Sequence, residues 1–225
     1  MSPTRHAGHV REHGSVLAQV EKRALVWIAK RIPRAINSDH LSILGLAAMA
    51  VAGAAYWASH WHSAMLFVAV GALAVNWFGD SLDGTVARVR NHQRPNYGFY
   101  VDHVIDIVGA LLLFGGLGLS PYMSPVVALL LLVAYLMISA EVYLATHACG
   151  IFRVSLLKVG PTELRILLAF GTLNLFSRPW VELGGSSYLL FDVGGVVAIV
   201  GMFAALVGST LRNTVALYRA EPLPR

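Results

Sequence analysis

Long hydrophobic runs separated by short polar segments dominate the pattern along this 225-residue chain. A membrane-spanning helix needs about 20 mostly apolar residues. Six runs approach or exceed this length: Leu41–His60, Ala64–Asp80, Gly98–Leu119, Pro125–His147, Glu163–Phe176 and Val193–Leu217. The second run keeps helical spacing to about Arg90, while segment 178–192, with Pro179, Gly184 and Gly185, is typical of a loop. The pattern predicts an all-α integral membrane protein with six transmembrane helices.

Two segments of different character precede these runs. Residues 1–15 are polar and predict a flexible tail, whereas 16–34 have amphipathic helical spacing. The apolar positions on one side of that helix are Val16, Leu17, Val20, Ala24, Trp27 and Ile28. This predicts an amphipathic helix in the membrane interface; the alternative is a helix packed on the protein's own cytosolic face. The six-helix transmembrane domain then occupies residues 35–225.

Composition agrees with a membrane protein. Hydrophobic residues make up 56% of the chain and charged residues 13%, about half the roughly 25% typical of soluble domains. These values argue against an ordinary cytosolic enzyme, a disordered chain and a nucleic-acid-binding domain. The single cysteine, Cys149, excludes an intramolecular disulfide and a cysteine-cluster metal site.

The 17 basic residues predict the orientation of the chain. With six spans and both termini on one side, the opposite side holds Arg178, and the terminal side holds the other sixteen. Lys and Arg concentrate on the cytoplasmic side of membrane proteins. We therefore expect a multi-pass protein, in the inner membrane if the source is bacterial, with both termini cytoplasmic.

Four aspartates in or beside the apolar runs indicate the chemistry. Asp80 and Asp83 are three residues apart, and Asp102 and Asp106 are four apart, so each pair shares one helical face. A carboxylate in a membrane span costs at least a few kcal/mol unless it is paired or bound to a cation. Two such pairs on adjacent antiparallel helices can enclose divalent cations, and oxygen ligands favour magnesium, manganese or calcium. A structural hydrogen-bonding role is the alternative.

Small residues and one arginine accompany these carboxylates. A bulky ligand can approach the backbone closely at the small residues Gly84, Ala87 and Gly98. Arg88 suggests that this ligand carries a phosphate, because a guanidinium pairs with phosphate in a fork. Two metal ions beside an arginine suit displacement at a phosphate or diphosphate. On spacing alone, a divalent-cation transporter and an intramembrane prenyltransferase remain as other classes.

At these residues the chain resembles the CDP-alcohol phosphatidyltransferases. The family signature is D-x2-D-G-x2-A-R-x8/9-G-x3-D-x3-D, and residues 80–106 fill every fixed position with the longer, nine-residue gap. Residues 38–42, Ser-Asp-His-Leu-Ser, also resemble the family's Pro-Asn-x-Leu-Thr, without its proline.

The resemblance implies an activity and a set of roles. A substituted phosphate would pass from a CDP-linked donor to an alcohol, releasing CMP, in phospholipid biosynthesis. Two Mg²⁺ or Mn²⁺ ions would be held by Asp80, Asp83, Asp102 and Asp106, with the active site on the cytoplasmic side. Asp106 would also be the general base on the acceptor hydroxyl.

The same resemblance assigns the residues around the carboxylates. Gly84, Ala87 and Gly98 would make room for the cytidine, and Arg88 would contact the donor phosphate. Thr85 would either contact the nucleotide or turn its hydroxyl to the helix backbone.

Two smaller motifs bear on the substrates. Asp102-His103 and Gly160-Pro161-Thr162-Glu163 resemble the choline/ethanolamine phosphotransferase branch. That branch takes a small CDP-alcohol as donor and diacylglycerol as acceptor, and we favour this polarity. His103 would then be a base or relay, or alternatively a packing residue. Glu163 would contact substrate, or alternatively favour the start of a helix.

A basic cluster supports the opposite polarity. Arg153, Lys158 and Arg165 could bind a polar acceptor such as glycerol phosphate, inositol phosphate or serine, with CDP-diacylglycerol as donor. Alternatively these charges set topology. The glycines of the third run, Gly109, Gly115, Gly116 and Gly118, indicate close packing either within the chain or across a homodimer.

Overall fold

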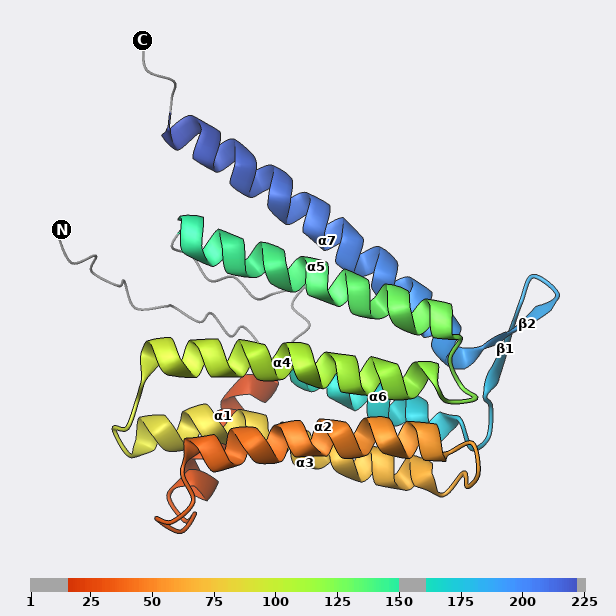
Figure 1. Cartoon of the computed structure of the whole chain (residues 1–225), viewed down its shortest axis with the longest axis horizontal. Helices are drawn as coiled ribbons and strands as arrows, with labels where there is room; N and C mark the ends of the chain where they lie inside the picture. The colour runs from red at the N-terminus through yellow and green to blue at the C-terminus, as the bar shows by residue number, and fades with distance from the viewer. Residues whose placement is uncertain (1–15, 150–160, 222–225) are drawn as a thin grey trace.

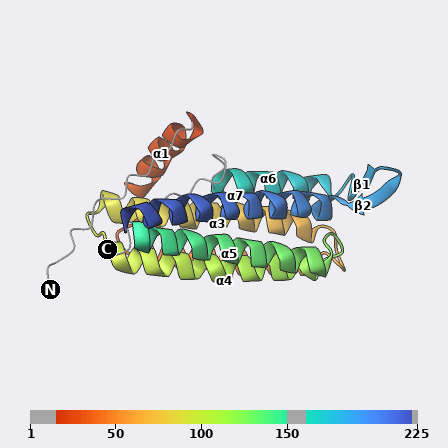
Figure 2. The same cartoon turned by 90° about the horizontal axis from the view of Figure 1, so that it is seen from above.

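The computed structural model describes residues 16–149 and 161–221, and these residues are mostly helical. Within them lie α1 (Val16–Ala29), α2 (Ser38–Ala58), α3 (Met65–Val89), α4 (Pro95–Gly118), α5 (Pro125–Cys149), α6 (Pro161–Asn174), β1 (Trp180–Leu183), β2 (Ser186–Leu189) and α7 (Leu190–Ala220). The long helices lie side by side in an elongated bundle (Figures 1 and 2).

Five of these helices, α2, α3, α4, α5 and α7, are long and apolar enough to cross a membrane. The chain is therefore a multi-pass membrane protein. The fifth predicted span corresponds to α6, whose 14 described residues cover about 21 Å at 1.5 Å per residue. This is shorter than the roughly 30 Å hydrocarbon core of a bilayer, so the described residues confirm five of the six expected spans.

The segment predicted as a loop before α7 contains a β-hairpin, so the prediction is wrong for the two strands. Strands β1 and β2 pair antiparallel, with Trp180 opposite Leu189 and Leu183 opposite Ser186. Gly184 and Gly185 turn the chain with φ values of 61° and 84°. Two consecutive positive φ angles suit a two-residue hairpin turn, and glycine adopts them at little cost.

Glycines bring α2 into backbone contact with α3 and α4. A Cβ added at Gly116 would overlap the Gly53 carbonyl of α2, and one added at Gly79 would lie 2.7 Å from the Leu41 carbonyl oxygen. Gly109 and Gly118 also face neighbouring residues of the same chain, while a Cβ at Gly115 would meet nothing within 4 Å. Three of the four glycines in the third run therefore serve packing within the chain.

Helix α1 packs against α3. Its Leu25 and Ala29 are buried with Leu82 and Val86, and the Glu21 carboxylate accepts a hydrogen bond from Trp77 Nε1 at 2.9 Å. Packing on α3 corresponds to the alternative, although Leu25 and Ala29 are not among the predicted apolar positions, of which Ala24 is exposed and Ile28 half-buried. Trp27, on the outer side of α1, is nevertheless 58% exposed.

Two arginines after α3 fix the start of α2. Arg90 donates to the carbonyl oxygens of Ile32, Pro33 and Ile36 at 2.9, 3.1 and 2.5 Å. Arg94 pairs with Asp39 at 2.5 Å. Both arginines lie in the nine-residue gap of the signature. Through these contacts the gap segment holds the connection between α1 and α2 in place.

A polar cluster joins α5 to α7. Glu141 Oε1 accepts hydrogen bonds from Ser209 Oγ at 2.8 Å and Asn213 Nδ2 at 2.9 Å. The intramembrane Glu141 is thus hydrogen-bonded between helices, as a polar group in a span requires.

Candidate active site

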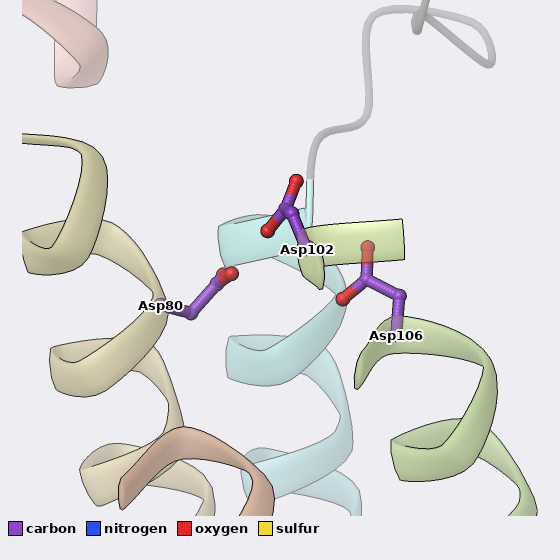
Figure 3. A group of neighbouring side chains, drawn as sticks. All are labelled: Asp80, Asp102 and Asp106. Atoms are coloured by element: carbon purple, nitrogen blue, oxygen red, sulfur yellow. The ribbon is translucent and has the colours of Figure 1, made fainter. Parts of the chain in front are cut away.

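Three of the four predicted carboxylates converge between α3 and α4. One oxygen each from Asp80, Asp102 and Asp106 lies within 4.8 Å of the other two. Figure 3 shows Asp80 on α3 pointing toward the two α4 aspartates. All three side chains are half-buried. The four-residue spacing places Asp102 above Asp106, and the α3–α4 turn brings Asp80 to their face.

Asp83 follows Asp80 by three residues on α3 and faces α2. Its Oδ2 accepts a hydrogen bond from Ser42 Oγ at 2.6 Å, and its Oδ1 accepts one from the Gly84 backbone N–H. Each carboxylate oxygen has two lone pairs, so these bonds leave acceptor capacity for a cation. Ser42 belongs to the short motif before the first span, and the sequence alone did not connect it to Asp83.

Arg165 contacts the carboxylate group from α6. Its Nη2 lies 2.7 Å from Asp80 Oδ2, with side-chain exposures of 19% and 29% for the arginine and the aspartate. The first turn of α6 is held against α1, because Thr162 Oγ1 donates to Glu21 Oε1 at 3.2 Å. Of the predicted basic cluster, Arg165 therefore reaches the site; Arg153 and Lys158 lie outside the described residues.

His103 points toward α5. Its Nδ1 is 2.5 Å from the Phe99 carbonyl oxygen, and its ring centroid is 4.5 Å from that of Tyr143 in an edge-on contact. A carbonyl only accepts hydrogen bonds, so Nδ1 carries a proton in this contact. Tyr143 was not identified from the sequence, because nothing in the α5 pattern distinguishes it from other aromatic positions.

The small signature residues leave space beside the carboxylates. A Cβ at Gly98 would meet nothing within 4 Å. At Gly84 the nearest atom to an added Cβ is Arg88 Nη1 at 3.2 Å, so the arginine lies over this glycine.

Thr85 and Arg88 interact on the same helix. Thr85 is buried and donates its hydroxyl to the Ser81 carbonyl at 3.0 Å, while it accepts from Arg88 Nη2 at 3.1 Å. The hydroxyl thus has the helix-facing geometry of the second alternative. Arg88 itself is exposed at the end of α3.

Ala87 lines a hollow of about 410 Å³ at the end of α3. The other lining residues come from the start of α2, the end of α3 and the connection to α4: Asn37, Ser38, Asp39, Val86, Arg90, His92, Gln93 and Arg94. Sequence patterns did not assign His92 or Gln93, because they occupy unspecified positions of the signature gap.

Glu163 lies in the first turn of α6 and is half-buried. This position fits the helix-start alternative, since an acidic side chain stabilises the positive end of a helix. It also places Glu163 two residues from Arg165, at the α6 end that contacts the carboxylates.

Residues 37–210 match a family model described as CDP-alcohol phosphatidyltransferase. The match begins at Asn37, which caps α2, and includes α3, α4, α6 and every residue of the candidate site. A comparison with curated proteins finds no match.

Proposed function

The chain belongs to the CDP-alcohol phosphatidyltransferase family, and on that premise we propose that it transfers a substituted phosphate from a CDP-linked donor to an alcohol and releases CMP. The family works in phospholipid synthesis, which agrees with the membrane-spanning helices. The observation that carries the proposal is the convergence of Asp80, Asp102 and Asp106 beside the signature residues.

The donor set fits a divalent cation. Family members use divalent metal ions, and three carboxylates within 4.8 Å are hard oxygen ligands of the kind that Mg²⁺ and Mn²⁺ prefer. Asp80, Asp102 and Asp106 would hold one ion, and Asp83 would contribute to a second. When bound, the ions would neutralise charge on the diphosphate and polarise the phosphoryl group under attack.

The protein's own groups would move the proton. Asp106 would accept the proton of the acceptor hydroxyl, whose oxygen forms a bond to the donor phosphorus. The bond from that phosphorus to the CMP oxygen breaks, and CMP leaves with the electron pair. A base must lie within hydrogen-bond reach of the hydroxyl. His103 is the alternative base, because it directly follows Asp102 in the chain.

The nucleotide would bind next to the carboxylates. Gly84, Ala87 and Gly98 would admit the cytidine; Ala87 also borders the hollow of about 410 Å³, whose lining residues do not include the four aspartates. Arg88 would contact a donor phosphate in fork geometry. Thr85 would act on the nucleotide through Arg88, since its hydroxyl proton is committed to the helix backbone.

For the substrates we favour CDP-ethanolamine or CDP-choline as donor and diacylglycerol as acceptor. The support is His103 next to Asp102 and Glu163 at the α6 end that contacts the site. CDP-diacylglycerol with glycerol phosphate, inositol phosphate or serine is the alternative, which the approach of Arg165 favours. Family membership argues against a cation transporter and a prenyltransferase.

The proposed topology has six spans, α6 being the fifth, with both termini and the active site cytoplasmic. It rests on the distribution of basic residues, all but Arg178 falling on one side. We also propose that the chain forms a homodimer.

The test is CMP release by the purified protein with Mg²⁺ or Mn²⁺. CDP-ethanolamine or CDP-choline would be offered with diacylglycerol, and CDP-diacylglycerol with the polar alcohols. We expect turnover with the first pair and a loss of about 10²-fold or more in Asp106→Asn. Glu182→Gln in the exposed hairpin is the matched control. No CMP-dependent chemistry with any donor, together with unchanged metal-dependent CDP binding in Asp83→Asn, would contradict the function.

A further inference from the structure

One side of α1 is covered by α3. Leu25 is 8% and Ala29 1% exposed, because both pack with Leu82 and Val86 of α3. Within residues 16–36 the acidic side chain, Glu21, accepts bonds from Trp77 and Thr162. The acidic side chain of this segment is thus engaged with α3 and α6.

The outward face of α1 is cationic and carries an aromatic side chain. Lys22, Arg23, Val26, Trp27, Lys30 and Arg31 line a hollow of about 390 Å³. The Arg31 guanidinium carbon lies 3.8 Å from the Trp27 ring centroid, and Arg31 Nη1 donates to the Trp27 carbonyl at 3.2 Å. We call these six residues the α1 basic face.

This face lies where the chain enters the membrane. Eight residues separate the end of α1 at Ala29 from the start of the membrane-spanning helix α2 at Ser38. Figure 2 shows α1 running obliquely away from the long axis of the bundle. Exposed Trp beside Lys and Arg is typical of the boundary between lipid and water.

We propose that the α1 basic face binds the headgroups of anionic phospholipids. Four cations complement a phosphodiester, with the Arg fork and the Lys ammonium groups as donors. Trp27, which is 58% exposed, and Val26 would contact the glycerol and the upper acyl chains of the lipid. A free phosphate ion has no such apolar part. The face thereby recruits anionic lipid beside an enzyme of lipid synthesis, independently of which CDP-alcohol the enzyme uses.

The test uses the full chain in phosphatidylcholine nanodiscs containing spin-labelled phosphatidylglycerol or spin-labelled phosphatidylcholine. Electron paramagnetic resonance gives the relative association of each lipid with the protein. We expect a severalfold preference for phosphatidylglycerol that falls toward one in Lys22→Gln/Arg23→Gln/Lys30→Gln/Arg31→Gln. The control Arg212→Gln/Arg219→Gln removes exposed cations of α7 and should keep the preference.

A wild-type protein without the preference, or a quadruple variant that retains it, would overturn the proposal. Displacement of the labelled lipid by millimolar inorganic phosphate would also overturn it, since the face would then be a phosphate site. Should the quadruple variant misfold, Lys30→Gln/Arg31→Gln must lower the preference, and 1 M NaCl must abolish it in the wild type. Failure of CMP release with a retained lipid preference would reject the proposed activity alone.

Discussion

The guanidinium of Arg165 on α6 lies 2.7 Å from a carboxylate oxygen of Asp80 on α3, inside the group of three aspartates. A fixed positive charge thus sits next to the proposed metal ligands. It balances part of their charge, and it also disfavours a cation at the Asp80 position.

Removal of this charge should strengthen metal binding. In Arg165→Gln we expect the Mn²⁺ affinity, measured by electron paramagnetic resonance, to rise about threefold to tenfold. The reason is that an ion pair partly exposed to solvent contributes on the order of 1 kcal/mol. Arg165→Lys should stay near wild type because it keeps the charge. Unchanged or weaker Mn²⁺ binding in the glutamine variant would contradict the prediction.

Ser42 should support Asp83. Its hydroxyl donates to the Asp83 carboxylate at 2.6 Å, and hydrogen bonds to charged groups contribute about 1.5–3 kcal/mol. We expect Ser42→Ala to weaken metal-dependent CDP binding by roughly tenfold in a calorimetric titration. Ser42→Thr keeps the donor and supplies the residue of the resembled Pro-Asn-x-Leu-Thr motif, so it should bind normally. Equal binding by the alanine and threonine variants would refute this role.

Two adjacent glycines of α4 should respond oppositely to the same substitution. A methyl group at Gly116 overlaps the backbone carbonyl of Gly53, which cannot move without separating α2 from α4. Gly116→Ala should therefore lower the free energy of unfolding by about 1–3 kcal/mol. Gly115→Ala adds a methyl with nothing within 4 Å and raises helix propensity, so it should be neutral or stabilising. Thermal unfolding in detergent measures both, and equal shifts would argue against the close crossing.

His103→Ala and Asp106→Ala separate the two candidate bases. We expect Asp106→Ala to lose about 10²–10⁴-fold in kcat and His103→Ala to lose far less. The reason is that Asp106 belongs to the carboxylate group, whereas the His103 ring packs against Phe99 and Tyr143. CMP release under saturating donor gives kcat. A comparable loss in both variants would make His103 part of the proton transfer.

Much of the site was predictable because it depends on spacing within single helices. The interval between Asp102 and Asp106 predicted a shared face, and the structure brings these two together with Asp80. Asp83, predicted on the same face as Asp80, lies outside this group and accepts from Ser42 of α2 instead. Helical periodicity also located the long apolar helices to within a few residues at most ends.

What the sequence did not predict depends on contacts between helices. Nothing in the local pattern pairs Arg165 with Asp80, 85 positions away, or Ser42 with Asp83, 41 positions away. The same holds for the Gly116–Gly53 crossing, which could equally have served a dimer. The β-hairpin was missed for another reason, since two glycines between short apolar segments predict a loop as readily as a two-residue turn.

One carboxylate oxygen joins three helices beside the candidate active site. Glu21 Oε1 accepts from Trp77 on α3 and from Thr162 on α6, so three helices meet at a single acceptor. A displacement of α1 from α3 would break both bonds and free Thr162 in the first turn of α6, three residues before Arg165. Glu21 thus ties the position of Arg165 beside Asp80 to the way α1 packs on α3.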